Sequence, residues 1–506
     1  MRPPSAVRLH AAAFAVVVGG WTACSRVAHP AADLIVTHAR IWTGDPNQPE
    51  ASAVAVIGER IVDVGSDDRI DAWRGDETRV IDAAQRRIVA GFNDAHVHLV
   101  DAGTAIEQID LRDAADAGEI IRRIGERARA SPGDWIAGGR WSARFAAGDL
   151  PTRSALDDVT NGSPVFVVDV DRRRALVNSA AFGRAGITDQ TPDPPDGRIV
   201  RDARGLTTGL VEGAALALVE RAVPRPTPAD RLRVVKRALE RAASLGVTSV
   251  HDIGASGEDV AAFAELAARD ELTARVYAVP DEAGWYDQAK LGIRRAFGST
   301  WLRLGAVIGT AATGGDAHAA DLFRTRLMAA DHAGLQVCML AAGAGGSAEA
   351  LNQLDDIVRA DGPRDRRFRI EHAERATSAD ARRFASLQAI ASLLPGPETA
   401  AAFDALTKER VRIALGTGWP ASTIDPMPMV QLIAERATTA DAIAAYTGGS
   451  AFAEFQDTQK GTIVRGRLAD FVILSDDLVT VPRARIAGVQ ALTTVVGGRI
   501  VHQRRP

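Results

Sequence analysis

The chain has 506 residues, of which 46% are hydrophobic and 25% are charged. This composition is typical of a globular protein and excludes a chain that is mainly disordered. The 60 basic and 64 acidic residues leave a net charge of −4, so we expect none of the strongly basic faces that bind nucleic acid. Two cysteines, Cys24 and Cys338, exclude a disulfide scaffold and a cysteine-based zinc finger.

The first element in chain order is a predicted signal peptide over residues 1–24. Two arginines precede the apolar run Ala11–Val18, and small residues follow it up to Cys24. The run is shorter than the roughly 20 apolar residues that span a bilayer. The segment before Cys24 is similar to a bacterial lipobox, so we expect export to the cell envelope, in the periplasm, with Cys24 acylated. The alternative is a plain signal peptide that is cleaved near Ala28.

Short strands with alternating polarity are predicted at both ends of the globular part. They cover residues 33–42, 51–57, 60–65, 468–474 and 495–501. Two short β segments at opposite ends of a chain most simply pair with each other. We therefore predict one small β-sandwich, composed of residues 33–87 and 456–506.

Between these ends, residues 88–455 alternate strand-like and helix-like segments. The predicted helices cover 117–130, 229–245, 258–269, 321–333, 347–360 and 378–387. The predicted strands cover 88–92, 165–168, 247–250, 274–279, 304–308, 335–340, 368–370, 389–393 and 412–415. This alternation predicts an α/β fold, a (β/α)8 TIM-like barrel at this length. Residues 130–225 are less regular and are interpreted as an insertion over the barrel mouth.

Histidines stand where three of the predicted strands end. His96 and His98 follow the first strand at a spacing of two, which places both imidazoles on one face. His372 and His251 end two further strands. Imidazoles that meet at the carboxyl end of a barrel can bind one metal ion. The alternative is that each is a solvated or hydrogen-bonded polar residue at a strand end.

Several motifs of the chain resemble the amidohydrolase superfamily, in particular its YtcJ-like, family-3 members. They include Asn93–His98, Trp135–Trp141, Pro151–Asp157, Ala175–Phe182, Gly246–Asp252, Arg369–Ala373, Gly416–Pro420, Ala445–Ala451 and Gly466–Asp470. The resemblance implies a barrel with a flanking β-sandwich. It also implies hydrolysis of non-peptide C–N bonds, in amides, formamides or cyclic amides, by metal-activated water.

The resemblance also assigns the site residues. His96, His98 and His372 match metal-ligand positions. Trp141 and Trp419, which stand in the quoted motifs, are the predicted substrate contacts together with Arg173. Arg173 belongs to a run of three arginines that would bind an anionic ligand, and the alternative is a solvated charge cluster.

Other positions depart from the family pattern. Where the family has a bridging lysine, further metal ligands and a catalytic carboxylate, this chain has Ile308, Leu340, Ala344, Pro397 and Gly418. None of the four lysines, at 236, 290, 408 and 460, is a simple substitute. Three histidines can hold zinc with one open position, but they supply no general base. The weak catalytic candidates that remain are Asp252 and Asp316, with Glu371 and Asp94 as further carboxylates; Asp94 could orient an imidazole ligand.

Two functions follow from these observations. The first is an exported metal-dependent hydrolase with a degenerate site that holds one divalent ion at most, expected to be zinc. The second is a catalytically inactive, exported ligand-binding protein on the same scaffold, because fold alone does not settle activity. In both cases the expected partner is a small molecule, nucleic acid is not expected, and the membrane is contacted only through a lipid anchor.

Overall fold

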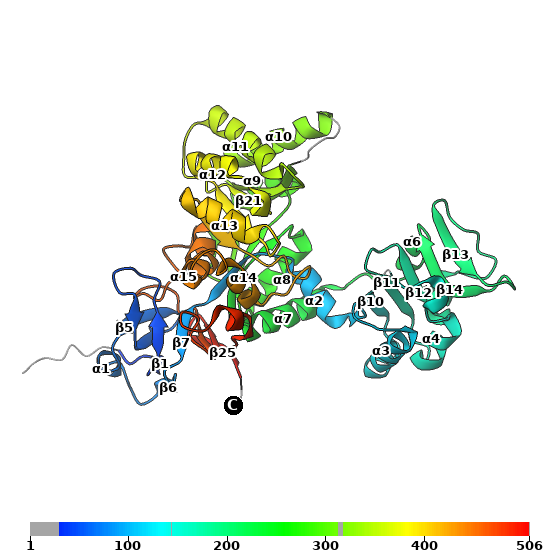
Figure 1. Ribbon diagram of the computed structural model, residues 1–506, viewed down its shortest axis with the longest axis horizontal. Coiled ribbons are helices and arrows are strands. Elements are labelled where there is room, and N and C mark those ends of the chain that lie inside the picture. Colours follow the sequence, from blue (N-terminus) through cyan, green and yellow to red (C-terminus); the bar gives the residue numbers. More distant parts are fainter. Residues whose placement is uncertain (1–29, 143, 312–316, 505–506) are drawn as a thin grey trace, which may run out of the picture.

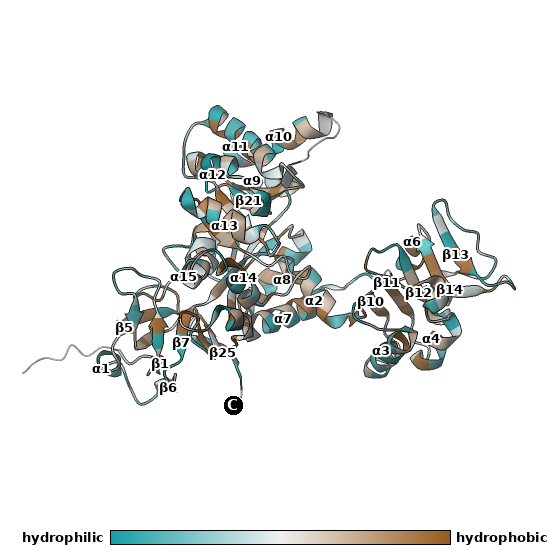
Figure 2. Cartoon of the chain, viewed as in Figure 1, coloured by the Kyte–Doolittle hydropathy of each residue, from teal (hydrophilic) through white to brown (hydrophobic). Residues whose placement is uncertain are grey.

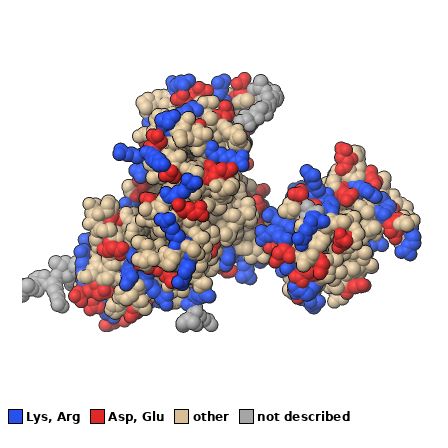
Figure 3. Space-filling view, in the orientation of Figure 1, with Lys and Arg blue, Asp and Glu red and all other residues tan. Residues whose placement is uncertain are grey.

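The computed structural model describes residues 30–142, 144–311 and 317–504 (Figure 1). The predicted signal peptide and Cys24 lie outside the described residues, as does Asp316. No helix within the described ranges is long and apolar enough to cross a membrane. Acidic and basic side chains are interspersed over the face seen in Figure 3.

Both chain ends meet in one six-stranded sheet. Its order is β26-β25-β24-β7-β2-β3, and a second sheet has the order β5-β4-β1-β6. The strands are β1 (Leu34–Thr37), β2 (Arg40–Trp42), β3 (Glu50–Ala51), β4 (Ala53–Ile57), β5 (Arg60–Gly65), β6 (Arg79–Asp82), β7 (Arg87–Ala90), β24 (Phe471–Leu474), β25 (Ala491–Val496) and β26 (Arg499–Gln503). Helix α1 (Asp67–Asp71) follows β5. One buried hydrophobic cluster contains residues of both sheets, among them Val54 and Phe471.

Two predicted strands of this region differ from the structure. The run 33–42 is divided into β1 and β2, which belong to different sheets, because His38 has a left-handed backbone (φ 49°) and its N–H binds Asp67 Oδ1 at 2.6 Å. The run 88–92 is not a barrel strand. Residues 87–90 form β7, which pairs with β2 and β24 in the sheet of the chain ends.

The centre of the molecule has a TIM-barrel-like α/β fold. Two five-stranded sheets have the orders β17-β18-β16-β15-β8 and β19-β20-β21-β22-β23, and their pairings are parallel except for β17 with β18. The strands are β8 (Phe92–Val97), β15 (Val247–Ile253), β16 (Arg275–Val279), β17 (Phe297–Gly298), β18 (Leu302–Leu304), β19 (Ala306–Ala311), β20 (Gln336–Ala341), β21 (Arg369–Glu371), β22 (Ile390–Leu393) and β23 (Arg412–Leu415). Isolated parallel bridges, Val97 with Trp419 and Asp281 with Ile308, connect the two sheets.

Helices surround these strands with their apolar faces turned inward (Figures 1 and 2). They are α2 (Leu99–Glu107), α7 (Pro228–Ser244), α8 (Gly257–Ala268), α9 (Trp285–Lys290), α10 (Ala317–His332), α11 (Gly346–Asp361), α12 (Ser378–Leu387), α13 (Thr399–Lys408), α14 (Pro426–Ile433), α15 (Thr439–Ala444) and α16 (Ser450–Ala453). The predicted helices 229–245, 258–269, 321–333, 347–360 and 378–387 are confirmed to within a few residues. Three of these helices, α7, α8 and α12, begin with a capping box, a local signal for the start of a helix.

A separate lobe stands beside the barrel (Figure 1). Its sheet has the order β13-β14-β12-β11-β10-β9. The elements are β9 (Ile109–Asp110), α3 (Ala117–Ala130), β10 (Ile136–Trp141), α4 (Arg153–Thr160), β11 (Val165–Asp169), β12 (Arg174–Val177), α5 (Ser179–Ala185), β13 (Gly197–Arg201), β14 (Thr207–Gly213) and α6 (Leu216–Glu220). The lobe has hydrophobic clusters of its own, to which α3 contributes Ile120 and Ile124. It therefore begins at β9 and includes the helix 117–130.

Candidate metal centre

The three predicted ligands line one cavity of about 600 Å³. His96 is near the end of β8 and His98 is the first residue after β8, where α2 begins. His372 directly follows β21. The cavity is thus at the carboxyl ends of the strands, the end at which barrels of this kind place their sites.

Two of the imidazoles are held through Nδ1. His96 Nδ1 lies 2.8 Å from Glu371 Oε2, and His98 Nδ1 lies 2.8 Å from the carbonyl oxygen of Ile253. Both acceptors require Nδ1–H, so in the neutral ring Nε2 is the unprotonated atom with a free lone pair. Burial lowers the pKa of His96, which favours the neutral ring. This is the arrangement in which protein histidines bind metal ions.

The spacing of the rings also matches a shared ion. The ring centroids of His96 and His98 are 5.4 Å apart, and those of His96 and His372 are 5.2 Å apart. Two imidazoles bound to one tetrahedral zinc ion at the usual Zn–N distance have centroids about 5 Å apart. Across the described residues, no group of three or more His, Cys, Asp or Glu side chains, these histidines included, is arranged so that it could hold a metal ion. The side chain of His372 is 42% exposed, and its Nδ1 lies 3.8 Å from Glu374 Oε1.

Glu371 connects His96 to a buried arginine. Its Oε1 lies 2.5 Å from Arg369 Nη2, and both side chains are fully buried. Burial by itself raises the pKa of Glu371, but the charge of Arg369 and the hydrogen bond from His96 lower it to about 2. Glu371 is therefore ionised and holds the His96 ring, a task that the sequence suggested for Asp94.

Behind Arg369 the chain of polar contacts continues to His251, Glu454 and Lys460. Arg369 Nη1 donates to His251 Nδ1 at 2.7 Å, and His251 Nε2 lies 3.2 Å from Glu454 Oε1. The Lys460 side chain is also buried, and its Nζ lies 2.7 Å from the same Glu454 oxygen. Burial lowers the pKa of His251 to about 4, so this histidine is neutral and serves the network.

The carboxylates that the sequence offered as catalytic candidates have other partners. Asp94 accepts hydrogen bonds from the backbone N–H of His96 (3.1 Å) and from Thr417 Oγ1 (2.7 Å), and burial raises its pKa to about 7. Asp252 accepts the N–H of Leu99 at 2.6 Å, in the first turn of α2, and burial raises its pKa to about 8. Neither carboxylate lines the cavity.

The positions that depart from the family pattern are apolar. Ile308 belongs to a buried cluster with Ile253, Tyr277 and Cys338, against which Leu340 packs. Gly418 lines the cavity with a left-handed backbone (φ 68°). No described residue therefore supplies a lysine bridge at Ile308 or a carboxylate at the end of β23.

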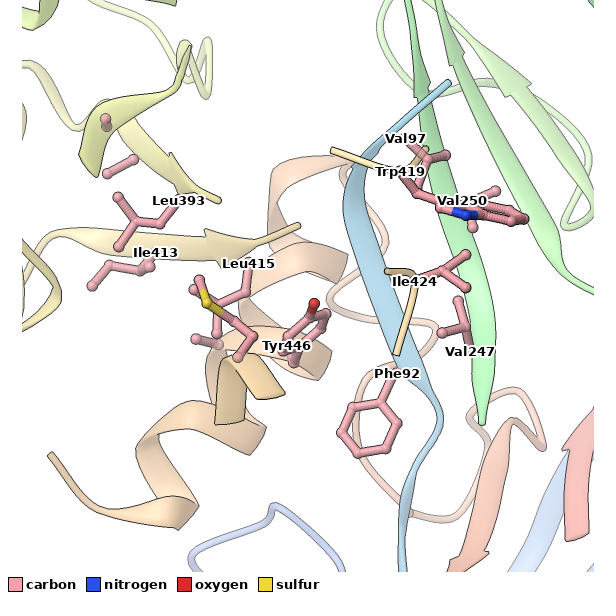
Figure 4. Close-up of a cluster of buried hydrophobic side chains, with 14 of the residues drawn as sticks. Phe92, Val97, Val247, Val250, Leu393, Ile413, Leu415, Trp419, Ile424 and Tyr446 are labelled. Atoms are coloured by element: carbon pink, nitrogen blue, oxygen red, sulfur yellow. The ribbon is translucent and has the colours of Figure 1, made fainter. Parts of the chain in front are cut away.

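The predicted substrate contacts do not line this cavity. Trp141 is fully buried in the core of the lobe, where the guanidinium of Arg174 lies 4.7 Å from its ring centroid. The side chain of Arg173 is on the exposed surface of the lobe. Trp419 packs beside Val97 and Val250 in the hydrophobic core (Figure 4). The two tryptophans are thus structural residues here.

Other charged residues, which the sequence reasoning missed, do line the cavity. They are Arg140, Glu374, Arg375 and Glu398. Glu374 Oε1 accepts the N–H of Leu394 at 2.7 Å and lies 3.8 Å from His372 Nδ1, and burial raises the pKa of Glu374. The sequence held one signal for Glu374, its position two residues after His372. Arg140 directly precedes Trp141, whose side chain is buried in the core of the lobe.

Comparison with known proteins agrees with this geometry. Residues 79–502 match the model of the amidohydrolase family. The chain is 30% identical to Protein LONG AFTER FAR-RED 3 of Arabidopsis thaliana, over 95% of this chain and 94% of that protein. It is 26% identical to the putative amidohydrolase YtcJ of Bacillus subtilis, over 92% of this chain and 98% of that protein.

A solved structure shows the same fold. It is an uncharacterized metal-dependent hydrolase from Pyrococcus furiosus, with a TM-score of 0.70 and 21% identity over 88% of this chain and 100% of that one. With the family match across most of its length, the chain belongs to the amidohydrolase family, and its relatives include a YtcJ-like protein.

Proposed function

We propose that this protein is a metal-dependent hydrolase of non-peptide C–N bonds, in amides, formamides or cyclic amides, with a single divalent ion. The observation that carries the proposal is the pair of histidines at one strand end. Both are held through Nδ1 and line the same cavity, and His372 lies at ligand spacing from one of them. The family and its metal-dependent members support the reaction class.

His96, His98 and His372 would hold the ion, for which zinc fits the nitrogen donors. Such an ion, when bound, would lower the pKa of a water molecule toward about 7 and so make hydroxide available. Glu371 keeps the His96 ring in the ligating tautomer. The charge of Arg369 keeps Glu371 ionised, so a buried carboxylate is always present to accept the hydrogen bond from His96.

Glu374 is our proposed proton acceptor. It lines the cavity beside His372, and its buried setting raises its pKa, which suits a group that takes up and releases a proton. Glu374 would take the role of the catalytic carboxylate that the family has at the position of Gly418. Arg140 and Arg375 add positive charge to the wall and would orient a polar or anionic part of the substrate.

Metal content tests the metal site directly. After incubation with zinc and removal of free ions, we expect about one zinc ion per chain in the wild type. His96→Ala and His98→Ala should lose it, while His332→Ala, at a side chain that is 84% exposed, should retain it. A His96→Ala protein that binds zinc as the wild type does would overturn the site.

The second candidate is a ligand-binding protein without activity. Gly418 at the carboxylate position and the apolar surroundings of Ile308 favour it. Zinc-loaded wild type and Glu374→Gln, assayed on a panel of formamides, cyclic amides and ureas, separate the candidates. Hydrolysis by the wild type that is lost in Glu374→Gln supports the hydrolase proposal. Saturable binding of these compounds with no turnover in either protein supports the binding protein.

We also propose the finer architecture and the location that the sequence suggested. The two central sheets would form one closed barrel, supported by the two bridges between them, and the terminal sheets one composite β-sandwich, supported by their shared cluster. The chain would be exported and anchored through Cys24. Fractionation of cells that express the wild type and Cys24→Ser tests the anchor, because only the wild type should stay with the membrane.

A further inference from the structure

A second cavity, of about 580 Å³, lies at the opposite end of the barrel strands. It is lined by the residues that lead into β21, β22 and β23, including Arg367, Ala389 and Val411. The histidine cavity lies at the carboxyl ends of the strands, so a molecule bound in the second cavity would not reach the imidazoles.

Five arginines dominate the wall of this cavity. They are Arg364, Arg366, Arg367, Arg410 and Arg412. Two carboxylates, Asp365 and Glu409, also line it. The excess of guanidinium groups in one concave surface is suited to an anion, because guanidinium donates parallel hydrogen bonds to phosphate or carboxylate oxygens.

Part of this cluster has a structural role. Asp331 pairs with Arg364 at 2.7 Å and with Arg366 Nε at 2.9 Å, and Asp457 pairs with Arg367 Nη1 at 2.7 Å. These contacts hold the segment before β21 against its neighbours. They explain why Arg366 and Arg367 are folded inward, but they do not use all of the donors.

Two buried donor atoms of the cluster have no hydrogen-bond partner among the described residues. Arg366 has a side chain that is only 4% exposed, yet its Nη2 makes no hydrogen bond. Arg367 Nε also makes none, although it lies 3.5 Å from Asp365 Oδ2. Arg410 and Arg412 are exposed and make no ion pair within the described ranges. Leaving a buried charged donor unsatisfied costs free energy, so Arg366 Nη2, together with the exposed Arg410 and Arg412 at the same cavity, points to an anionic ligand.

The cavity also has an apolar side. Phe384, Leu387 and Phe452 line it. The guanidinium carbons of Arg367 and Arg412 lie 3.8 and 5.0 Å from the ring centroid of Phe452, so this ring and the cationic groups are neighbours. A cavity of about 580 Å³ has the size of a site for a small organic molecule.

We propose that this cavity binds a small organic molecule that carries a phosphate group. The phosphate would accept hydrogen bonds from Arg366 Nη2, Arg367 Nε, Arg410 and Arg412. The organic part would pack against Phe384, Leu387 and Phe452. This site is independent of the hydrolase proposal, since it shares no lining residue with the histidine cavity.

Calorimetric titration of metal-free protein at constant ionic strength tests the proposal, with inorganic phosphate and phenyl phosphate as probes. We expect one saturable site and phenyl phosphate bound about tenfold more tightly than inorganic phosphate, because the ring gains apolar contacts. Arg410→Ala/Arg412→Ala should weaken both ligands at least about tenfold, since two charge-assisted contacts are lost. Both side chains are exposed, so this variant should fold.

The matched control is Arg483→Ala/Arg485→Ala, which removes two exposed arginines at the same spacing that form no ion pair within the described residues. It should bind both probes as the wild type does, and so should His96→Ala. The proposal is overturned if the wild type shows no saturable binding, if all variants bind equally, or if phenyl phosphate binds no more tightly than phosphate. Loss of binding in His96→Ala would place the ligand in the other cavity and would also overturn it.

Discussion

Glu371 is buried between two partners, the imidazole of His96 and the guanidinium of Arg369. Its carboxylate therefore serves two purposes, since it sets the tautomer of a proposed metal ligand and neutralises a cation that has no access to water. The two purposes can be tested separately, because the first affects zinc affinity and the second affects the free energy of unfolding.

Glu371→Gln removes the charge but leaves an amide oxygen that can accept from His96. Because Arg369 keeps a buried, uncompensated charge, we expect the free energy of unfolding to fall by about 3–5 kcal/mol. We also expect zinc affinity to fall by up to about 10–100-fold, because a neutral amide supports the His96 ring less well than a carboxylate does. Urea unfolding and zinc competition measure the two effects. Glu398→Gln, at a half-exposed carboxylate of the same cavity, is the control and should change stability by less than about 1 kcal/mol.

Asp252 gives a pH-dependent prediction. Burial raises its pKa to about 8, so between its unfolded pKa near 4 and pH 8 the unfolded chain has lost a proton that the folded chain keeps. The contribution of Asp252 to the free energy of unfolding must therefore fall as the pH rises from about 4 to 8. Asp252→Asn keeps an acceptor for the Leu99 N–H and removes the titration. The free energy of unfolding of Asp252→Asn relative to the wild type should therefore rise by up to about 4 kcal/mol from pH 5 to pH 8.

Urea unfolding of both proteins in EDTA at pH 5, 6.5 and 8 measures this difference. A difference in stability that is the same at all three pH values would mean that Asp252 is already ionised in the folded protein.

At the scale of elements, helix α2 depends on its contact with α7. A Cβ on Gly103 would lie 1.9 Å from the backbone oxygen of Val234, so the two helices approach as closely as glycine permits. Because α2 begins directly after His98, the contact also fixes the direction in which the chain leaves the proposed metal site.

Gly103→Ala should therefore separate α2 from α7 and destabilise the protein by about 2–4 kcal/mol, in the range of overpacked or strained core sites. Gly183→Ala in α5 is the matched control. Nothing lies within 4 Å of its added Cβ, so it should stabilise the protein by about 0.5–1 kcal/mol through helix propensity. Thermal unfolding of the two variants measures both changes in stability. The same change in both variants would contradict the close contact between α2 and α7.

For the whole molecule, a buried ion pair joins the central strands to the sheet of the chain ends. Arg275 of β16 donates to both oxygens of Asp470, at 2.7 and 2.9 Å, and Asp470 also accepts the N–H of Gly497. The pair connects the barrel, the segment that leads into β24 and the turn before β26. We therefore expect these parts to unfold together.

Asp470→Ala should lower the free energy of unfolding by about 3–5 kcal/mol, because Arg275 remains buried without its main partner. Asp71→Ala breaks the exposed pair with Arg74 and should cost less than about 1 kcal/mol. Denaturation followed by far-UV circular dichroism and by tryptophan fluorescence gives the comparison. A small effect of Asp470→Ala would contradict a main role of this ion pair in holding the terminal sheets to the central strands.

The sequence by itself determined the features that depend on neighbours within about 20 residues. Hydrophobic periodicity located most central helices and strands, and the spacing of two placed His96 and His98 on one face of a strand. Such patterns are readable because burial of one face is imposed on each helix or strand separately. Even here, the strand 33–42 was wrong, because the break at His38 depends on a hydrogen bond to Asp67, 29 residues away.

The tertiary structure decided which side chains meet. Glu371 reaches His96 across 275 residues of sequence, Trp141 turns into the core of a lobe, and Arg140 beside it lines the cavity. Residue types and spacing carry no information on such contacts, because a side chain's partner is set by how whole layers pack and by which buried charges must be neutralised. The histidines were therefore visible in the sequence, while the groups that orient them became visible only in the folded chain.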